Sequence, residues 1–287
     1  MKRCLAFVMG GGGARGALQV GALRALLEAG LTPDLLVGTS IGAVNAASLA
    51  LWGVNVAGTR LLARVYQEVA SLNFLDPHVA RLTLRAALGR MNSQANRRVA
   101  EFLATKGMTP DLRFDRIRSV RLGLVAADLD TGEPVIFGRD PSDLILDGVL
   151  ASVALQPWFA PVEKDGRSLV DGGLLSNLPI EPALTMGATE IVALDLTDPR
   201  RKPSNDRSVQ RHLGRLAFAI GQRQRALEMA IATARGAPVH CINLLAPAAT
   251  TIWDFGDSQQ LVETGYEIAS QHIPDLTRLK DDQRCGR

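Results

Sequence analysis

Two short apolar segments, each followed by a glycine-containing turn and a helix, constrain the fold of this 287-residue chain most strongly. Cys4 to Met9 is an apolar run that stops at a glycine, and Asp34 to Val37 is a second short segment, apolar after Asp34, that also stops at a glycine. Runs of this length are typical of buried parallel strands. Helices are predicted after them, over Ala14 to Ala29 and Ile41 to Leu51. The repeated order of strand, turn and helix predicts a mainly parallel sheet with helices on its faces.

The rest of the chain extends this pattern as a single domain over residues 1–287. Further strands are predicted at 120–126, 134–137, 168–170, 191–196 and 239–244. A mostly helical insertion is expected at about 55–110 and a long helix at about 209–235. Within the insertion, residues 72–90 place leucines beside Arg81, Arg85 and Arg90. That pattern fits a helix packed on the core and also a helix lying on an anionic membrane.

Composition excludes several classes of protein. Aromatic residues make up 5% of the chain, so a stacking surface for nucleic acid is not expected. The net charge of +3 permits attraction to an anionic membrane or substrate without requiring it. The three cysteines have neither zinc-site nor disulfide spacing, so no metal and no cofactor is expected.

Localisation follows from the apolar segments. The six-residue apolar run before the first glycines is too short for the core of a signal peptide. No other stretch reaches the length of a membrane span. We therefore expect a cytoplasmic protein whose membrane contact, where it occurs, is peripheral.

The sharpest local motif is Gly38-Thr39-Ser40-Ile41-Gly42, between a predicted strand and a predicted helix. A serine on a tight strand-to-helix turn projects into a cleft, where it can act as a nucleophile beside the amides of the following helix. The other interpretation is a helix N-cap formed by Thr39 or Ser40. The motif alone leaves both interpretations open.

A glycine-rich segment, Gly10-Gly11-Gly12-Gly13-Ala14-Arg15-Gly16, follows the first predicted strand. Consecutive glycines let backbone N–H groups converge on an anion, either a phosphate or the oxyanion of an acyl-transfer intermediate. No Gly-Lys-Ser/Thr follows, as a P-loop requires. The acidic strand end of a dinucleotide site is missing too. A structural turn is the simpler alternative, although four glycines exceed what such a turn needs.

A serine nucleophile needs a base, and none of the four histidines has a supportive context: His78, His212, His240 and His272. Asp171-Gly172-Gly173 instead follows the predicted strand 168–170. This puts a carboxylate at a strand end, where ligand crevices open in α/β sheets. An ordinary Asp-Gly reverse turn is the alternative.

Together the three segments resemble the patatin-like phospholipase family, and flanking residues such as Gly21 to Leu26 and Ala151 to Pro161 resemble its bacterial branch. The resemblance implies a three-layer α/β/α sandwich and a Ser–Asp dyad without histidine. Ser40 would be the nucleophile and Asp171 its base, with the amides of Gly12 and Gly13 as the oxyanion hole and Arg15 supporting that loop. The remaining motif positions are Gly11, Gly16, Gly38, Gly42, Gly172 and Gly173.

The implied activity is hydrolysis of lipid acyl esters of the phospholipid or lysophospholipid type. An acyltransferase that uses the same acyl-enzyme is the nearest alternative. A histidine-based α/β-hydrolase and a nucleotide-binding protein are the others. Head group, acyl-chain length and oligomeric state are left open by the sequence.

Overall fold

The computed structural model of the chain describes residues 3–70, 93–198, 209–247, 250 and 252–285. Within them, seven strands form a mixed sheet in the order β5-β6-β3-β2-β1-β7-β8, and β4 pairs with β3. The neighbours β3, β2, β1, β7 and β8 run parallel, whereas β4 and β6 are antiparallel to β3, and β5 is antiparallel to β6. The strands are β1 (Leu5–Met9), β2 (Leu35–Thr39), β3 (Arg121–Asp128), β4 (Pro134–Phe137), β5 (Val162–Lys164), β6 (Arg167–Asp171), β7 (Glu190–Asp195) and β8 (Val239–Asn243).

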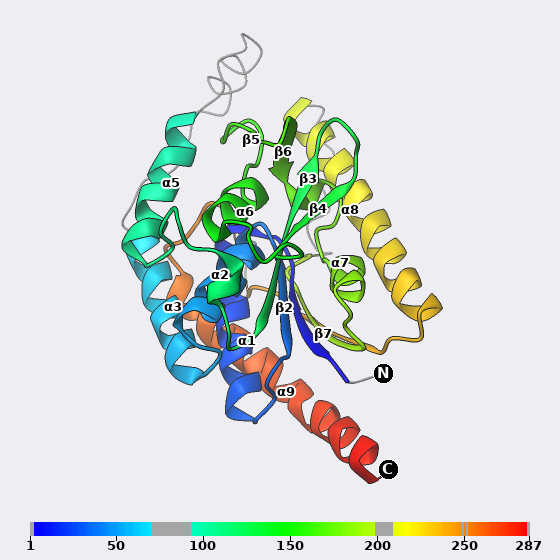
Figure 1. The fold of residues 1–287 in the computed structure, drawn as a ribbon. Coiled ribbons are helices and arrows are strands. Elements are labelled where there is room, and N and C mark those ends of the chain that lie inside the picture. The colour runs from blue at the N-terminus through cyan, green and yellow to red at the C-terminus, as the bar shows by residue number, and fades with distance from the viewer. Residues whose placement is uncertain (1–2, 71–92, 199–208, 248–249, 251, 286–287) are drawn as a thin grey trace.

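Helices cover both faces of this sheet. Figure 1 shows α1, α2, α3 and α9 on one side and α7 and α8 on the other. The expected three-layer α/β/α sandwich with a mainly parallel sheet is thereby confirmed. The helices are α1 (Gly16–Glu28), α2 (Ile41–Trp52), α3 (Val56–Ala70), α5 (Ser93–Thr105), α6 (Ile145–Ser152), α7 (Ile180–Thr185), α8 (Val209–Ala234) and α9 (Ser258–Cys285).

The alternation of side chains along β1 explains why the sheet needs two helical layers. Leu5, Phe7 and Met9 belong to the core that includes α1, α2 and α9. Ala6 and Val8 face the opposite core, against α7 and α8. Since successive side chains of a strand point to opposite faces, a strand that is apolar at every position must be buried on both.

The seven predicted strands agree to within two residues with the observed strands other than β5. Sequence reasoning did not anticipate the short β5 or the helices α6 and α7. Within the expected helical insertion the structure contains α3 and α5, and α8 covers Val209–Ala234, where a helix over 209–235 is expected. The amphipathic stretch 72–90 lies outside the described residues. Within the described ranges, every helix is too short or too polar to span a bilayer.

The order of the strands determines where a crevice can open. Strand β1 pairs with β2 on one side and with β7 on the other. The chain leaves β1 toward α1 on one face and leaves β7 toward α8 on the other face (Figure 1). In α/β sheets a ligand crevice lies where connections diverge in this way, outside the carboxyl ends of the strands. The glycine-rich segment after β1 lies at this point.

Candidate active site

The register of three strands brings two of the predicted motifs together. Thr39 at the end of β2 pairs with Val125 of β3. The next residue of β3, Ala126, pairs with Asp171 of β6. Ser40 follows Thr39 directly, so it lies level with Asp171 across one intervening strand.

Asp171 lies at the end of an antiparallel strand, whereas the sequence predicts the end of a parallel one. The rule about strand ends concerns parallel sheets, but β6 runs antiparallel to β3. Asp171 reaches the crevice because Leu169 of β6 pairs with Asp128 at the end of β3, and β6 ends two residues later at Asp171, beside Ser40. The expectation that Asp171 ends a strand is confirmed, although the strand points the other way.

Ser40 and Asp171 are in direct contact. The Ser40 Oγ hydroxyl donates a hydrogen bond of 2.7 Å to Asp171 Oδ2, and the backbone N–H of Gly173 donates one of 2.7 Å to Asp171 Oδ1. Asp171 is only 6% exposed. Its burial raises the pKa of the carboxyl group from 3.8 to about 6, although both hydrogen bonds act to lower it. The carboxylate is therefore ionised near neutral pH and more basic than an exposed aspartate.

Ser40 precedes α2 in a strained turn, and its side chain does not cap the helix. Its φ is 56° and its ψ is −124°, and its side chain makes no capping hydrogen bond to the helix. Glycine is needed on both sides because a Cβ on Gly38 would lie 2.2 Å from the carbonyl oxygen of Gly42. Likewise, a Cβ on Gly42 would lie 2.1 Å from the carbonyl oxygen of Met9. The close packing of this turn thus excludes larger residues and directs the serine hydroxyl to Asp171.

Ser152, which no sequence motif indicates, holds this turn in place. The backbone N–H of Ser40 donates to Ser152 Oγ at 2.9 Å, and the Ser152 hydroxyl donates to the carbonyl oxygen of Val125 at 2.6 Å. Ser152 is fully buried at the end of α6. It therefore links the strained turn to β3, the strand between Ser40 and Asp171.

The backbone amides of Gly12 and Gly13 in the glycine-rich segment lie beside Ser40. The neighbouring N–H groups of Gly11 and Ala14 donate to the carbonyl oxygens of Asn177 and Ile252. Among the described residues, the N–H groups of Gly12 and Gly13 have no acceptor, and both glycines line the same cavity as Ser40. Unpaired backbone donors at such a place can bind an anion.

Steric constraints explain the glycines themselves. A Cβ on Gly11 would lie 3.2 Å from Ser40 Cβ and 2.5 Å from the side-chain oxygen of Asn177. Gly13 has a φ of +60°, and a Cβ there would lie 2.1 Å from the carbonyl oxygen of Ile252. A simple turn would need glycine only at the position of positive φ. The close approach at Gly11 shows that the segment is packed directly against the serine turn.

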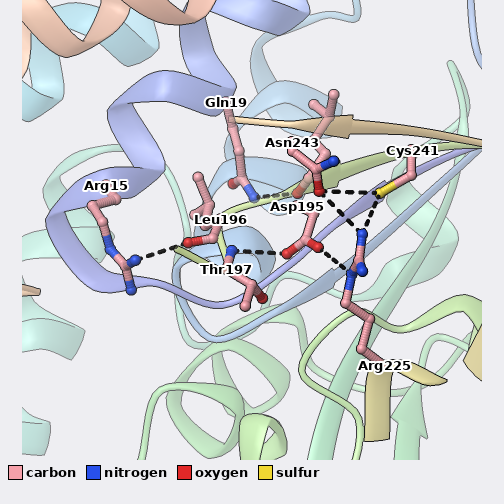
Figure 2. Close-up of polar contacts among 9 residues, drawn as sticks. Arg15, Gln19, Asp195, Leu196, Thr197, Arg225, Cys241 and Asn243 are labelled. Atoms are coloured by element: carbon pink, nitrogen blue, oxygen red, sulfur yellow. Dashed lines mark hydrogen bonds and ion pairs between the residues drawn. The ribbon is translucent and has the colours of Figure 1, made fainter. Parts of the chain in front are cut away.

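Arg15 supports the glycine segment from behind. Its Nε donates to the carbonyl oxygen of Gly12 at 3.2 Å. Its Nη1 donates to the carbonyl oxygen of Leu196 at 2.8 Å (Figure 2). A Cβ on Gly12 would lie 2.8 Å from the Leu196 side chain, so the two segments are in close contact. Arg15 therefore joins the loop after β1 to the loop after β7.

The loop after β7 is in turn held by α8. The buried carboxylate of Asp195 accepts hydrogen bonds from the backbone N–H of Thr197 at 2.8 Å and from Arg225 Nε at 2.6 Å (Figure 2). Arg225 Nη2 also donates to Asn243 Oδ1 on β8 at 3.1 Å. Helix α8 thus positions the segment that packs on Gly12.

A second contact of α8 reaches the serine turn. Thr39 Oγ1 donates to the carbonyl oxygen of Ser176 at 2.8 Å, and the Ser176 hydroxyl donates to Glu228 of α8. Burial raises the pKa of the Glu228 carboxyl group to about 7. Its other oxygen accepts from the backbone N–H of Glu181 at 2.5 Å. The loop after Asp171 is therefore fixed to α8 by a buried carboxyl group.

A buried polar network supports the glycine segment from the opposite face. Gln19 Nε2 donates to the carbonyl oxygens of Gly10 and Leu194, at 2.8 and 3.1 Å. Asn45 Nδ2 donates to Gln19 Oε1 at 2.9 Å, and the Tyr66 hydroxyl donates to Asn45 Oδ1 at 3.0 Å. Burial raises the pKa of the Tyr66 hydroxyl, which keeps it protonated as a donor. The network joins α1, α2 and α3 to the ends of β1 and β7.

Ser40, Asp171, Gly12 and Gly13 all line one cavity of about 870 Å³, whose walls are mainly apolar. No histidine is found among the described residues that line it. His240 lies on β8 with its Nε2 3.8 Å from Glu190 Oε1, and His78 is outside the described residues. In the described part of the chain, no cluster of three His, Cys, Asp or Glu side chains could hold a metal ion.

Comparison with known proteins assigns the family. The model of the patatin-like phospholipase family matches residues 7–184, more than half of the chain, so this chain belongs to that family. Patatin-like phospholipase domain-containing protein 6 of Homo sapiens is 32% identical over 194 residues, which are 67% of this chain and 13% of that protein. An NTE family protein of Mycobacterium tuberculosis is 30% identical over 207 residues, 70% of this chain and 51% of that protein. The matched region thus spans about half of the mycobacterial relative and about an eighth of the human one.

A solved structure shares the fold. Human GIVD cytosolic phospholipase A2, in complex with methyl gamma-linolenyl fluorophosphonate and terbium chloride, matches with a TM-score of 0.56. The match covers 99% of this chain and 60% of that chain at 14% sequence identity. At this identity the likeness concerns the fold alone.

Burial of Asp171 gives a prediction about stability. A pKa of about 6 against 3.8 in the unfolded chain means that ionised Asp171 costs the folded state about 3 kcal/mol above pH 6, and less as the pH falls toward 4. Asparagine is neutral, and its Oδ1 can still accept from the N–H of Gly173 while its Nδ2 donates to Ser40 Oγ. Asp171→Asn should therefore raise the free energy of unfolding by about 1–3 kcal/mol at pH 8 and by less at pH 5. Denaturant titrations at both pH values measure this difference.

The exposed Asp130 provides the control, since Asp130→Asn should change stability little at either pH. A gain for Asp171→Asn that is equal at pH 5 and pH 8, or no gain at either, would contradict the assigned cause.

Proposed function

We propose that the protein is a serine acyl-ester hydrolase that cleaves lipid esters of the phospholipid or lysophospholipid type. The observation that carries this proposal is the 2.7 Å hydrogen bond from Ser40 Oγ to Asp171 Oδ2 within a large apolar cavity. Ser40 is the proposed nucleophile and Asp171 its base. Residues 1–287 are proposed to act as one catalytic domain, since α9 at the end of the chain packs in the same core as α1.

The proposed reaction uses these groups in two steps. Ser40 Oγ attacks the ester carbonyl carbon and its proton passes to Asp171, while the N–H groups of Gly12 and Gly13 bind the resulting oxyanion. The bond to the alcohol breaks and the alcohol takes the proton from Asp171, which leaves an acyl-serine. Asp171 then accepts a proton from water, the water oxygen attacks the acyl group, and the carboxylic acid leaves as Ser40 regains its proton.

The raised pKa of Asp171 supports this role. An aspartate with an ordinary pKa of 3.8 is a weak base toward a serine hydroxyl, and general bases work best with a pKa near the working pH. Burial brings the pKa of Asp171 to about 6 without the help of a histidine. The two oxyanion donors, Gly12 and Gly13, would further stabilise the transition state. Loss of one such donor typically costs about 2.7–4 kcal/mol of that stabilisation.

The shape of the cavity supports a long acyl chain as the substrate group. One face of α2 lines it with residues spaced three or four apart, namely Ile41, Val44, Ser48 and Trp52. From Ile41 to Trp52 this face is about 17 Å long. One leaflet of a bilayer is about 15 Å deep, half of the hydrocarbon core. We call the part of the cavity along this face of α2 the groove. Its length therefore matches that of a membrane acyl chain.

The walls and the far end of this groove are also defined. Helices α3 and α5 line the groove with apolar residues at helical spacing. These are Leu62, Val65, Tyr66 and Val69 of α3 and Val99, Phe102 and Leu103 of α5. At the far end Trp52 Nε1 donates to the carbonyl oxygen of Lys106 at 3.0 Å, and Lys106 forms an ion pair with Glu68. Such walls suit a hydrocarbon chain and not a nucleotide.

Fluorophosphonate labelling tests the proposed nucleophile. The wild-type protein should be labelled on Ser40 and should hydrolyse a soluble ester, and Ser40→Ala should lose both properties while its unfolding curve stays close to that of the wild type. Peptide mapping by mass spectrometry identifies the labelled residue. Labelling of another residue, or unchanged turnover by folded Ser40→Ala, would refute the proposal.

Products measured with and without an added alcohol acceptor distinguish the hydrolase from an acyltransferase.

The proposed base predicts a pH profile. Protonated Asp171 cannot accept the serine proton, so kcat/KM for a soluble ester should fall about tenfold for each pH unit below about 6 and level off above it. Initial rates from pH 4.5 to 8.5, with folding checked at each pH, measure the profile. A flat profile across pH 6 would exclude Asp171 as the titrating base.

The groove along α2 predicts chain-length selectivity. Val44→Phe should place a ring across the groove one turn from Ser40 and lower the ratio of kcat/KM for palmitoyl esters to that for butyryl esters about tenfold, or about 1.4 kcal/mol. Leu61→Phe on the exposed side of α3 is the control and should leave the ratio unchanged. An unchanged ratio in Val44→Phe would argue against an acyl chain in this groove.

A further inference from the structure

Exposed apolar side chains gather at the mouth of the cavity. Among the described residues, six large apolar side chains are more than two-fifths exposed: Leu61, Leu129, Leu174, Leu216, Ile220 and Leu227. Four of the six, Leu129, Leu174, Leu216 and Ile220, also line the cavity that contains Ser40. We call these four residues the mouth rim. Single exposed leucines are common on protein surfaces, but a group around one opening marks an interaction site.

The mouth rim is assembled from three segments that are distant in the sequence. Leu129 follows β3, Leu174 ends the turn after Asp171, and Leu216 and Ile220 lie one helical turn apart on α8. Hydrogen bonds hold these segments. The N–H of Leu129 donates to the carbonyl oxygen of Ser168, and Gln224 of α8 donates through Nε2 to the carbonyl oxygen of Leu174. The rim is thus part of the folded structure around the opening.

The charge beside the mouth rim is positive on α8. Arg215 and Arg223 are exposed and flank Leu216 and Ile220. The acid of α8, Glu228, is buried and bonded to Ser176, while Arg225 is paired with Asp195. On the opposite side, the exposed Asp130 follows Leu129. An apolar surface flanked by arginines complements a layer of anionic head groups above hydrocarbon.

We propose that the mouth rim, together with Arg215 and Arg223, docks on the surface of an anionic phospholipid bilayer. The inference rests on the proposed function, because a lipid ester must pass from the bilayer into the cavity. With the rim residues inserted at the boundary between head groups and acyl chains, the opening faces the hydrocarbon directly. The acyl chain then enters the groove along α2 without crossing water.

Vesicle flotation of the full chain tests the docking surface. The double variant Leu216→Ser/Ile220→Ser should bind vesicles of phosphatidylglycerol and phosphatidylcholine at least tenfold more weakly than the wild type. The matched control is Leu227→Ser on the same helix, an exposed leucine that does not line the cavity, and it should bind within twofold of the wild type. Equal binding by the rim variant and the control would overturn the proposal. Melting curves verify that both variants are folded.

The cationic part of the surface has its own test. Arg215→Gln/Arg223→Gln should bind the anionic vesicles several-fold more weakly than the wild type, and added salt should weaken wild-type binding. Binding to pure phosphatidylcholine as strong as to the anionic vesicles would overturn the role of the arginines. A dimer that the rim variant abolishes, without wild-type binding to vesicles, would show an interface between two copies of the chain instead.

Failure of docking and failure of the proposed function can be distinguished. Ser40→Ala should bind the anionic vesicles like the wild type, since docking does not need the serine hydroxyl. A wild-type protein that hydrolyses a soluble ester but does not float with vesicles would overturn the docking proposal alone. One that floats with vesicles and hydrolyses no ester would support docking and refute the hydrolase.

Discussion

The contact between the Ser40 hydroxyl and the Asp171 carboxylate depends on the register in which β3 pairs with β2 and β6. Thr39 is level with Val125, and Ala126 with Asp171, so the two side chains meet across one strand. A shift of either pairing by one residue would turn the side chains to opposite faces of the sheet. Both cores of the sandwich stabilise this register because the central strands are buried on both faces.

Burial of Asp171 links stability to the proposed chemistry. The surroundings that make its carboxylate a stronger base also make the ionised group costly in the folded protein. The strained backbone of Ser40 adds a second local cost. Ser152 Oγ accepts a hydrogen bond from the Ser40 N–H, while Gln19 and Arg15 donate to the segments around it, so these contacts hold the strained turn in place.

The motifs, the central strands and the first two helices could be predicted because each has a local cause. Strands apolar at every position, glycine turns and the absence of a suitable histidine are all visible in the residue order. Ser152, Gln19 and Asn45 could not be found in the same way, since each is a single polar residue within a helix and belongs to no motif. Helix α8 was expected, but not its contacts through Arg225 and Glu228, because partners tens of residues apart give no periodic signal.

By itself, the sequence determined the layered α/β/α architecture and the residues that carry the family's motifs, because hydrophobic periodicity and glycine turns act over a few residues. Only the tertiary structure decided that the Ser40 side chain bonds Asp171 and makes no cap to its helix, and that β6 approaches antiparallel. It also decided that the amides of Gly12 and Gly13 find no acceptor among the described residues beside the serine. These features depend on strand register and on burial, which arise when distant segments pack together. The basicity of Asp171 has the same origin, since water is excluded from its carboxylate only in the folded chain.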